Sequence, residues 1–206
     1  MALKASVAAL VVVGLSWLLA KAIRNRGPYS IDGAALSGWT LVRGGPGDPA
    51  LVALQPPSPL SAALFQQLLR RAGPSLVAPE RPSVPLVLQS EYADSLQGVL
   101  SVEDVLDVAR DAGVEAARFE PICMGRRESA DGRSGRLFFV LFEAPAFDRF
   151  RDQLTPLFPE HTGAFPYDPK ALHPILTIAA TDRESARWWP IMVDQRTDCQ
   201  ASLRTR

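Results

Sequence analysis

The residues best suited to chemistry lie in the segment 172–179, LHPILTIA, which contains one of the two histidines of the chain. Side chains two positions apart share one face of an extended strand, so His173, Ile175 and Thr177 are expected on the same side. Histidine suits proton transfer because its ordinary pKa lies near neutrality. The alternation therefore predicts a strand that presents an imidazole and a hydroxyl to one surface. The plainer alternative is a partly exposed histidine at the entry to the strand.

Two neighbouring arginines, Arg126 and Arg127, form a second candidate site. Their guanidinium groups carry forked donors that suit phosphate oxygens, although the solvated end of a hairpin would also explain them. The other histidine, His161, is followed by Thr162 in an expected loop. Neither histidine has a nearby pair of carboxylates at a suitable spacing, and two cysteines are too few for a structural zinc site. We therefore expect no metal and no cofactor.

The composition is that of an ordinary folded chain without a net charge. Its 206 residues are 47% hydrophobic and 21% charged, which predicts one sizeable domain. Lys plus Arg and Asp plus Glu are equal at 22 each, so no dedicated nucleic-acid surface is expected. The two cysteines, Cys123 and Cys199, do not form the dense pattern of a disulfide scaffold. Cys123 is expected to be a buried free thiol.

An uncharged run of 16 residues, ASVAALVVVGLSWLLA, lies between Lys4 and Lys21. As a helix it would be roughly 24 Å long, and snorkelling lysines together with Ala22 and Ile23 make a membrane span feasible. We predict a transmembrane helix whose residues 5–23 contact the lipid bilayer. The positive charges after the run favour a cytoplasmic domain. The alternative is export after signal cleavage near Ala22, because small residues flank Lys21.

The rest of the chain divides into a linker, a folded domain and a tail, after the anchor and its basic flank at 1–26. Residues 27–49 are rich in glycine and turn residues and are interpreted as a linker with one short strand near residues 39–42. Residues 50–194 alternate between strand and helix patterns and form the predicted α/β domain. Residues 195–206 carry no pattern and are expected to be disordered.

Within the predicted domain the order is strand, helix, strand, helix, strand, strand, helix, strand. Ser58 followed by Pro59 is typical of a helix start, as is Ser101 before the second helix. The segments 117–128 and 135–144 have the pattern of a hairpin around the polar loop 129–134. Such alternation predicts an α/β or α+β sheet with helices on its outer face.

Two of these strands resemble the signature strands of the two-histidine phosphoesterase superfamily, the 2′–5′ RNA ligase and cyclic phosphodiesterase group. The usual string is Pro-His-hydrophobic-Thr-hydrophobic, and HPILTIA is similar to it, with Ile175 in the histidine slot and Thr177 in the hydroxyl slot. PSVPLVLQ is similar to the first signature strand, with Ser83 and Pro85 in those slots. The element order resembles that of the family over residues 50–182. The resemblance implies an α+β, two-lobed fold whose sheets flank a central cleft, preceded here by the transmembrane helix.

The departures from the family pattern bear directly on activity. In the family one histidine activates the attacking group, the other protonates the leaving oxygen, and the hydroxyls hold phosphoryl oxygens. Ser83 and Ile175 cannot transfer these protons, and Pro85 has no hydroxyl. The resemblance therefore implies a degenerate member that lacks both motif histidines.

Two functional hypotheses follow. The first is a membrane-tethered, non-catalytic phosphoesterase-like domain that binds a protein partner or a phosphorylated, nucleotide-like ligand. Its cleft would be lined by Ser83, Pro85, Ile175, Thr177, Arg126 and Arg127. The alternative is an active RNA or nucleotide cyclic phosphodiesterase that uses His173 and Thr177 in a shifted geometry. A third interpretation is a cell-envelope protein that shares only the architecture.

The first hypothesis makes a geometric prediction about the two signature strands. They should lie near each other across a groove. Alternation should turn the side chains between the slot residues towards the helices, namely Leu86, Leu88, Leu176 and Ile178.

Overall fold

The structure, a computed structural model, describes residues 27–72, 75–128, 135–155, 167–183 and 193–206. These residues form two sheets, one with five strands in the order β1-β8-β5-β6-β7 and one with three in the order β2-β3-β4. The architecture is α+β, as the sequence predicts. The segment 1–26, which contains the expected tether, lies outside the described residues. Within the described ranges, no helix has the length and apolar character needed to cross a membrane.

The strands are β1 (Tyr29–Ile31), β2 (Thr40–Arg43), β3 (Ala50–Gln55), β4 (Val84–Leu88), β5 (Glu120–Glu128), β6 (Arg136–Glu143), β7 (Ile175–Ala180) and β8 (Cys199–Thr205). The helices are α2 (Ser58–Ala72), α3 (Gln89–Glu91), α4 (Val102–Asp111), α5 (Pro145–Leu154) and α6 (Gln195–Asp198), with short helical turns η1 (Gly33–Leu36) and η2 (Tyr92–Leu96). The elements predicted between residues 50 and 182 are confirmed, and Ser101 caps α4 by accepting from the backbone N–H of Asp104 at 3.2 Å.

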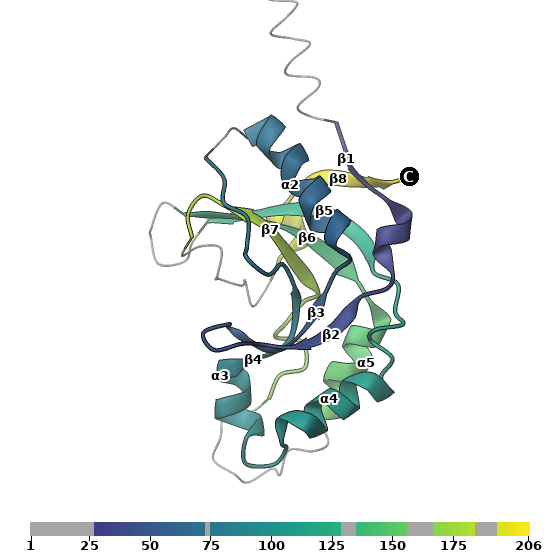
Figure 1. Ribbon diagram of the computed structural model, residues 1–206, viewed down its shortest axis with the longest axis vertical. Helices are drawn as coiled ribbons and strands as arrows, with labels where there is room; N and C mark the ends of the chain where they lie inside the picture. Colours follow the sequence, from purple (N-terminus) through teal and green to yellow (C-terminus); the bar gives the residue numbers. More distant parts are fainter. Residues whose placement is uncertain (1–26, 73–74, 129–134, 156–166, 184–192) are drawn as a thin grey trace, which may run out of the picture.

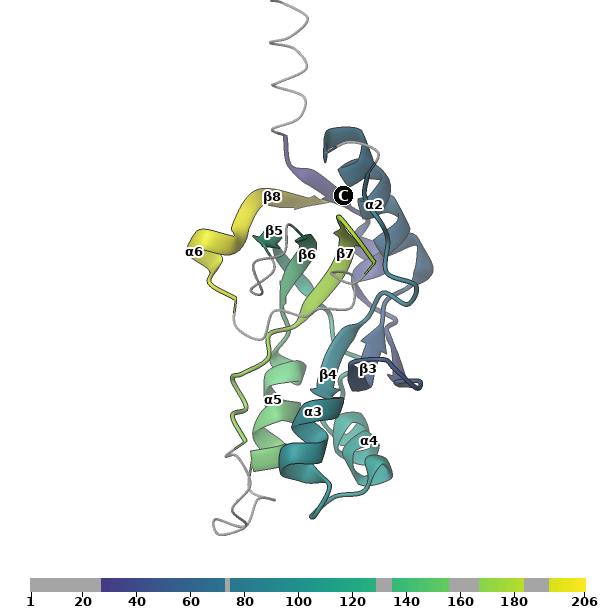
Figure 2. The same ribbon diagram turned by 90° about the vertical axis from the view of Figure 1, so that its left-hand side faces the viewer.

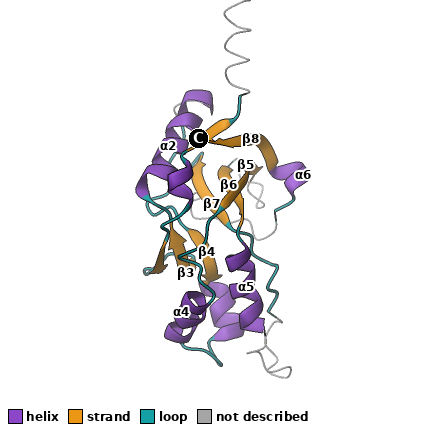
Figure 3. Cartoon of the chain, turned by 90° about the vertical axis from the view of Figure 1, so that its right-hand side faces the viewer, coloured by secondary structure: helices purple, strands orange, loops and turns teal. Residues whose placement is uncertain are grey.

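The two sheets divide the molecule into two ends (Figures 1 and 3). We call β1, β5–β8 and α2 the five-stranded half, and β2–β4 with α3, α4 and α5 the three-stranded half. One hydrophobic core runs through both halves, since it contains Leu64 of α2, Leu86 of β4, Phe147 of α5 and Leu176 of β7. A smaller apolar cluster lies on the other face of the five-stranded sheet, around Phe139.

Helix α2 shows how the apolar spacing builds the core. Leu60, Leu64 and Leu68 are all buried, because residues four apart lie on one face of a helix. This face packs in the main core together with Leu176 and Ile178 of β7. The prediction that those two residues face the helices is therefore confirmed.

The segment 27–49 is not a linker. It contributes β1, η1 and β2, and its apolar residues Ile31, Leu36 and Trp39 are buried in the main core. The Trp39 ring stacks on Phe119 with the ring centroids 4.2 Å apart. The glycines and prolines mark turns between short elements, and those elements are stabilised by distant partners that no local pattern reveals.

The tail 195–206 is ordered, which contradicts the expectation of disorder. It forms α6 and then β8, which lies between β1 and β5 in the five-stranded sheet (Figure 2). Strand β8 runs parallel to β1 and antiparallel to β5. Alternate residues Ala201 and Leu203 pack against the main core. Backbone hydrogen bonds to a strand on each side also hold β8 in the sheet.

Cys123 is not a free thiol, since it forms a disulfide with Cys199. The two residues lie on neighbouring antiparallel strands, β5 and β8, with their Cα atoms 5.7 Å apart. They are 76 residues apart in the sequence, so spacing alone could not reveal that they meet. The disulfide fastens the C-terminal strand to the middle of the sheet.

Arg151 of α5 is a buried charge at the centre of the three-stranded half, with only 1% of its surface exposed. Its guanidinium forms a two-pronged ion pair with Glu91, through contacts of 2.7 and 2.9 Å. It also donates to the backbone carbonyls of Leu86, Asp168 and Pro169. The network joins α5 to β4, to α3 and to the segment that leads into β7.

Candidate functional site

Strands β4 and β7, which resemble the two signature strands, lie close together as predicted, but Pro85, Ile175 and Thr177 are buried and do not line a groove between them. Strand β4 contacts β7 directly. In addition, Val77, in the segment that leads to β4, pairs with Ala180 through two backbone hydrogen bonds of 2.8 and 2.9 Å. The strands that should carry the site are therefore neighbours across the boundary between the two halves.

The slot residues of β7 are buried. Ile175 and Thr177 pair with Leu141 and Phe139 of β6, so both belong to the face that carries the smaller apolar cluster. Ile175 packs within that cluster. Thr177 is 1% exposed, and its hydroxyl finds no hydrogen-bond partner among the described residues. Neither slot presents a reactive group to solvent.

His173 lies close to α5. It is half-buried just before β7, and it interacts electrostatically with the carboxyl group of Asp148 in α5. Burial raises the pKa of Asp148 and Asp152 adds to this rise, whereas the charge of His173 opposes it. Four extended residues separate the Cα atoms of His173 and Thr177 by roughly 13 Å. One reacting atom cannot touch both side chains.

Of the two slot residues of the first signature strand, Ser83 lines a cavity and Pro85 is not among the residues that line it. Pro85 is buried opposite Ala53 of β3, whereas Ser83 is half-buried at the wall of a cavity of about 280 Å³ on the outer side of the three-stranded sheet. We call this space the Ser83 cavity. Its lining is Val42, Arg43, Gly44, Asp48, Ala50, Ala53, Gln55, Arg81, Pro82 and Ser83.

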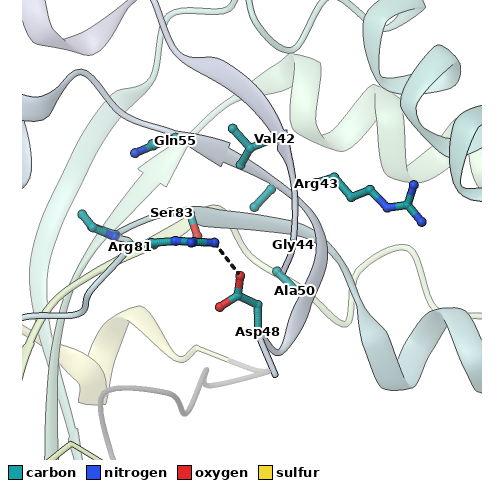
Figure 4. A pocket seen from close by; sticks show the side chains of 10 residues that line it. Val42, Arg43, Gly44, Asp48, Ala50, Gln55, Arg81 and Ser83 are labelled. Carbon is teal, nitrogen blue, oxygen red and sulfur yellow. Dashed lines mark ion pairs between the residues drawn. The ribbon is translucent and has the colours of Figure 1, made fainter. Parts of the chain in front are cut away.

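The residues that line the Ser83 cavity include two cations, one anion and two neutral polar side chains. Arg81 reaches across it to Asp48, with 3.6 Å between guanidinium nitrogen and carboxylate oxygen, whereas Arg43 points away (Figure 4). The arginine side chain is 74% exposed, so this ion pair contributes little to stability. The hydroxyl of Ser83 and the amide of Gln55 complete the polar lining. The arrangement can donate hydrogen bonds to an anionic ligand, but it holds no pair of proton-transferring groups.

The turn 44–49 positions Asp48 in this cavity. The Asp48 carboxylate accepts a hydrogen bond from the backbone N–H of Gly45 at 2.7 Å. Gly47 has φ of +83°, which glycine adopts without steric cost. At Gly44 a Cβ atom would collide with the backbone carbonyl of Ala50. These glycines are therefore required by a tight hairpin turn.

The neighbouring arginines of β5 point to opposite faces of the sheet. Arg126 lies opposite Phe138 and lines a second cavity, on the main-core face. Arg127 lies on the other face, within 3.9 Å of the Asp198 carboxylate of α6. Strand alternation explains the separation, and neither arginine lines the Ser83 cavity. The six residues of the predicted cleft therefore do not share one site: Ser83 and Arg126 line different cavities, Arg127 lies beside Asp198, and the other three are buried, namely Pro85, Ile175 and Thr177.

Sequence reasoning missed the charged partners of Ser83. Arg81 precedes Ser83 by two residues, so alternation could have assigned both to one side. Asp48 belongs to a turn whose proximity to Arg81 depends on the pairing of β3 with β4. His161 lies outside the described residues. Comparison with known proteins adds no assignment: no protein-family model matches the chain, and no curated protein or solved structure is significantly similar to it.

Proposed function

We propose that this protein is a membrane-tethered, non-catalytic domain of the two-histidine phosphoesterase type that binds a small phosphorylated, nucleotide-like ligand in the Ser83 cavity. The proposal rests on which residues occupy the two positions that would hold the family's histidines, and on what surrounds them. One holds Ile175 inside an apolar cluster, and the other holds Ser83 beside a cavity. The tether would be the segment 5–23, in which Ala22 and Ile23 extend the uncharged run Ala5–Ala20 and Lys21 can snorkel, so that a membrane span is feasible.

The chemistry of the cavity supports binding without turnover. Arg81 carries forked donors that match phosphate oxygens, and the Ser83 hydroxyl and Gln55 amide can select the rest of the ligand. The general acid and base of phosphodiester hydrolysis would have to come from titratable groups near neutral pH. His173, beside Asp148, has no access to a hydroxyl partner at Thr177, and this argues against the shifted phosphodiesterase.

The disulfide favours a location on the oxidising side of the membrane. Disulfides persist in secreted and cell-envelope compartments and are rare in the reducing cytosol. The bond between Cys123 and Cys199 therefore weighs against the cytoplasmic orientation expected from the positive charges near Lys21. Our proposal therefore places the tethered domain on the extracytoplasmic side, and the alternative is export after signal cleavage near Ala22.

Binding is tested with the full chain purified in a non-ionic detergent. Calorimetric titration with a nucleoside 2′-monophosphate should show binding that weakens roughly tenfold in Arg81→Gln, because a charge-assisted hydrogen bond contributes about 1.5–3 kcal/mol. The matched control is Arg43→Gln, which removes an arginine of the same cavity that points away from Asp48. Equal losses in both variants, or no binding at all, would point to a protein partner or to no ligand here.

Catalysis is tested on the same preparation with nucleoside 2′,3′-cyclic phosphates. We expect no hydrolysis above background. Turnover that disappears in His173→Ala and persists in Arg81→Gln would establish the enzyme and reject the binding function.

The location is tested in intact cells. A thiol reagent should fail to modify Cys123 and Cys199 unless a reductant is added first, and protease added outside the cytoplasmic membrane should digest the domain. Rapid labelling of the cysteines without a reductant, together with protection from the protease, would show that the domain is cytoplasmic.

A further inference from the structure

The second cavity lies at the end of the molecule where β1 begins. It has a volume of about 480 Å³ and lies among β1, the end of α2, β5, β6 and β8. Its lining is Tyr29, Arg71, Met124, Gly125, Arg126, Phe138, Gln200 and Ala201. The lining contains two arginines and no carboxylate, and it shares no residue with the Ser83 cavity.

Arg71 is held in place before any ligand arrives. Two of its nitrogens donate to the backbone carbonyls of Gly27 and Pro28, at 2.6 and 2.9 Å. Its guanidinium carbon lies 3.8 Å from the centroid of the Tyr29 ring. A guanidinium has five N–H donors, so these two bonds orient the fork and leave donors for a ligand. Orientation in advance lowers the entropic cost of binding.

Arg126 supplies the second charge from strand β5. It is exposed, and among the described residues it forms no ion pair. Glu128, two positions further along the same strand, does not line the cavity. The floor consists of the core-facing side chains Met124, Phe138 and Ala201. An apolar floor strengthens the field of both charges because it excludes water from one side.

We propose that this cavity binds a phosphate group through Arg71 and Arg126. Two guanidinium forks without a competing carboxylate match the charge and geometry of phosphate oxygens, and the Gln200 amide can bond to a neighbouring polar group. The site is distinct from the Ser83 cavity and does not depend on the function proposed for it.

The position of the cavity suggests one source for the phosphate. Tyr29 lines it, and the apolar run expected to enter the bilayer ends at residue 23. Six residues can span at most about 20 Å, so a tethered domain would hold this cavity close to the phospholipid headgroups. A soluble phosphate monoester is the other source.

The test uses the full chain in a non-ionic detergent and three probes: inorganic phosphate, glycerol 3-phosphate and a short-chain phosphatidylglycerol. Calorimetry should detect binding of at least one probe. Arg126→Gln should weaken it roughly tenfold, the loss expected for one charge-assisted hydrogen bond. The matched control is Arg127→Gln, which removes the same charge one residue away on the opposite face of β5. It should change the affinity less than twofold.

The outcomes separate the sources and the two sites. Stronger binding of the short-chain lipid than of glycerol 3-phosphate supports the site and identifies a headgroup, and the reverse order supports the site and identifies a soluble phosphate. Arg81→Gln should leave binding here unchanged, so that failure of the Ser83 cavity does not count against this site. Equal losses in Arg126→Gln and Arg127→Gln, or no binding of any probe, would overturn the proposal. Unchanged melting temperatures establish that each variant is folded.

Discussion

Both halves of the molecule contain a tyrosine packed against an arginine, but the two arginines serve different purposes. In the five-stranded half, Arg71 lies 3.8 Å from the Tyr29 ring centroid at the wall of an open cavity. In the three-stranded half, Arg151 lies 4.6 Å from the Tyr167 ring centroid and is buried. The difference is the carboxylate of Glu91, which neutralises Arg151.

This comparison shows how the surroundings decide what an arginine does. A buried guanidinium is tolerated only when its charge and donors are satisfied, and Arg151 has a partner for each of its three nitrogens. Arg71 has two backbone acceptors and no carboxylate in its cavity, so it can still bind an anion. We therefore expect Arg151 to determine stability and Arg71 to contribute to binding.

The largest effect is expected from removing the buried charge. Arg151→Met should lower the free energy of unfolding by about 3–5 kcal/mol, because it leaves Glu91 uncompensated and three carbonyls without their donor. Urea denaturation measures the loss. Arg110→Met is the control, since Arg110 forms an exposed pair with Asp107 and should cost less than about 1 kcal/mol. Similar losses for the two variants would mean that the buried network does not hold the three-stranded half together.

A smaller effect is expected from opening the disulfide of the five-stranded half. Replacing both Cys123 and Cys199 with serine should cost about 2–4 kcal/mol, because a crosslink between residues 76 apart restricts the unfolded chain. Thermal unfolding compares the melting temperatures of the variant and the parent. Added reductant should lower the melting temperature of the parent and leave that of the variant unchanged. If reductant leaves the melting temperature of the parent unchanged, the crosslink does not stabilise this half.

The smallest effect concerns the two tyrosines and alkaline pH. Burial raises the pKa of Tyr167 strongly and that of Tyr29 to a lesser extent, and the neighbouring arginine opposes each rise. The folded protein keeps these protons above the ordinary tyrosine pKa of about 10, whereas the unfolded chain loses them there. Stability should therefore fall as the pH rises past 10, by up to about 1.4 kcal/mol per pH unit and tyrosine.

Two variants separate the contributions of the tyrosines. Tyr167→Phe should remove more of the alkaline loss than Tyr29→Phe, as measured by urea denaturation between pH 9 and 11. The reverse order would place the more strongly buried phenol in the five-stranded half. If neither variant reduces the loss of stability at alkaline pH, that loss comes from groups other than these two tyrosines.

Local sequence patterns were sufficient for the elements between residues 50 and 182. Leucine spacing in α2, the serine cap of α4 and the hairpin of β5 and β6 each depend on neighbours in the chain. These features could be predicted because propensity, capping and amphipathic spacing are properties of a single element. The resemblance to the two-histidine family, which would put Ser83 and Ile175 in the histidine slots, stays a prediction.

The tertiary structure alone decided which elements meet. It paired β8 with β1 and β5, joined Cys123 to Cys199, and ordered segments that the sequence marked as linker and tail. It also buried Thr177 and placed Arg126 and Arg127 on opposite faces of β5, so that the residues of the expected cleft do not line one cavity. A local pattern shows which face of an element is apolar, but the partner of that face depends on contacts between residues far apart in the chain. Those contacts determine which charges are neutralised and which can bind a ligand.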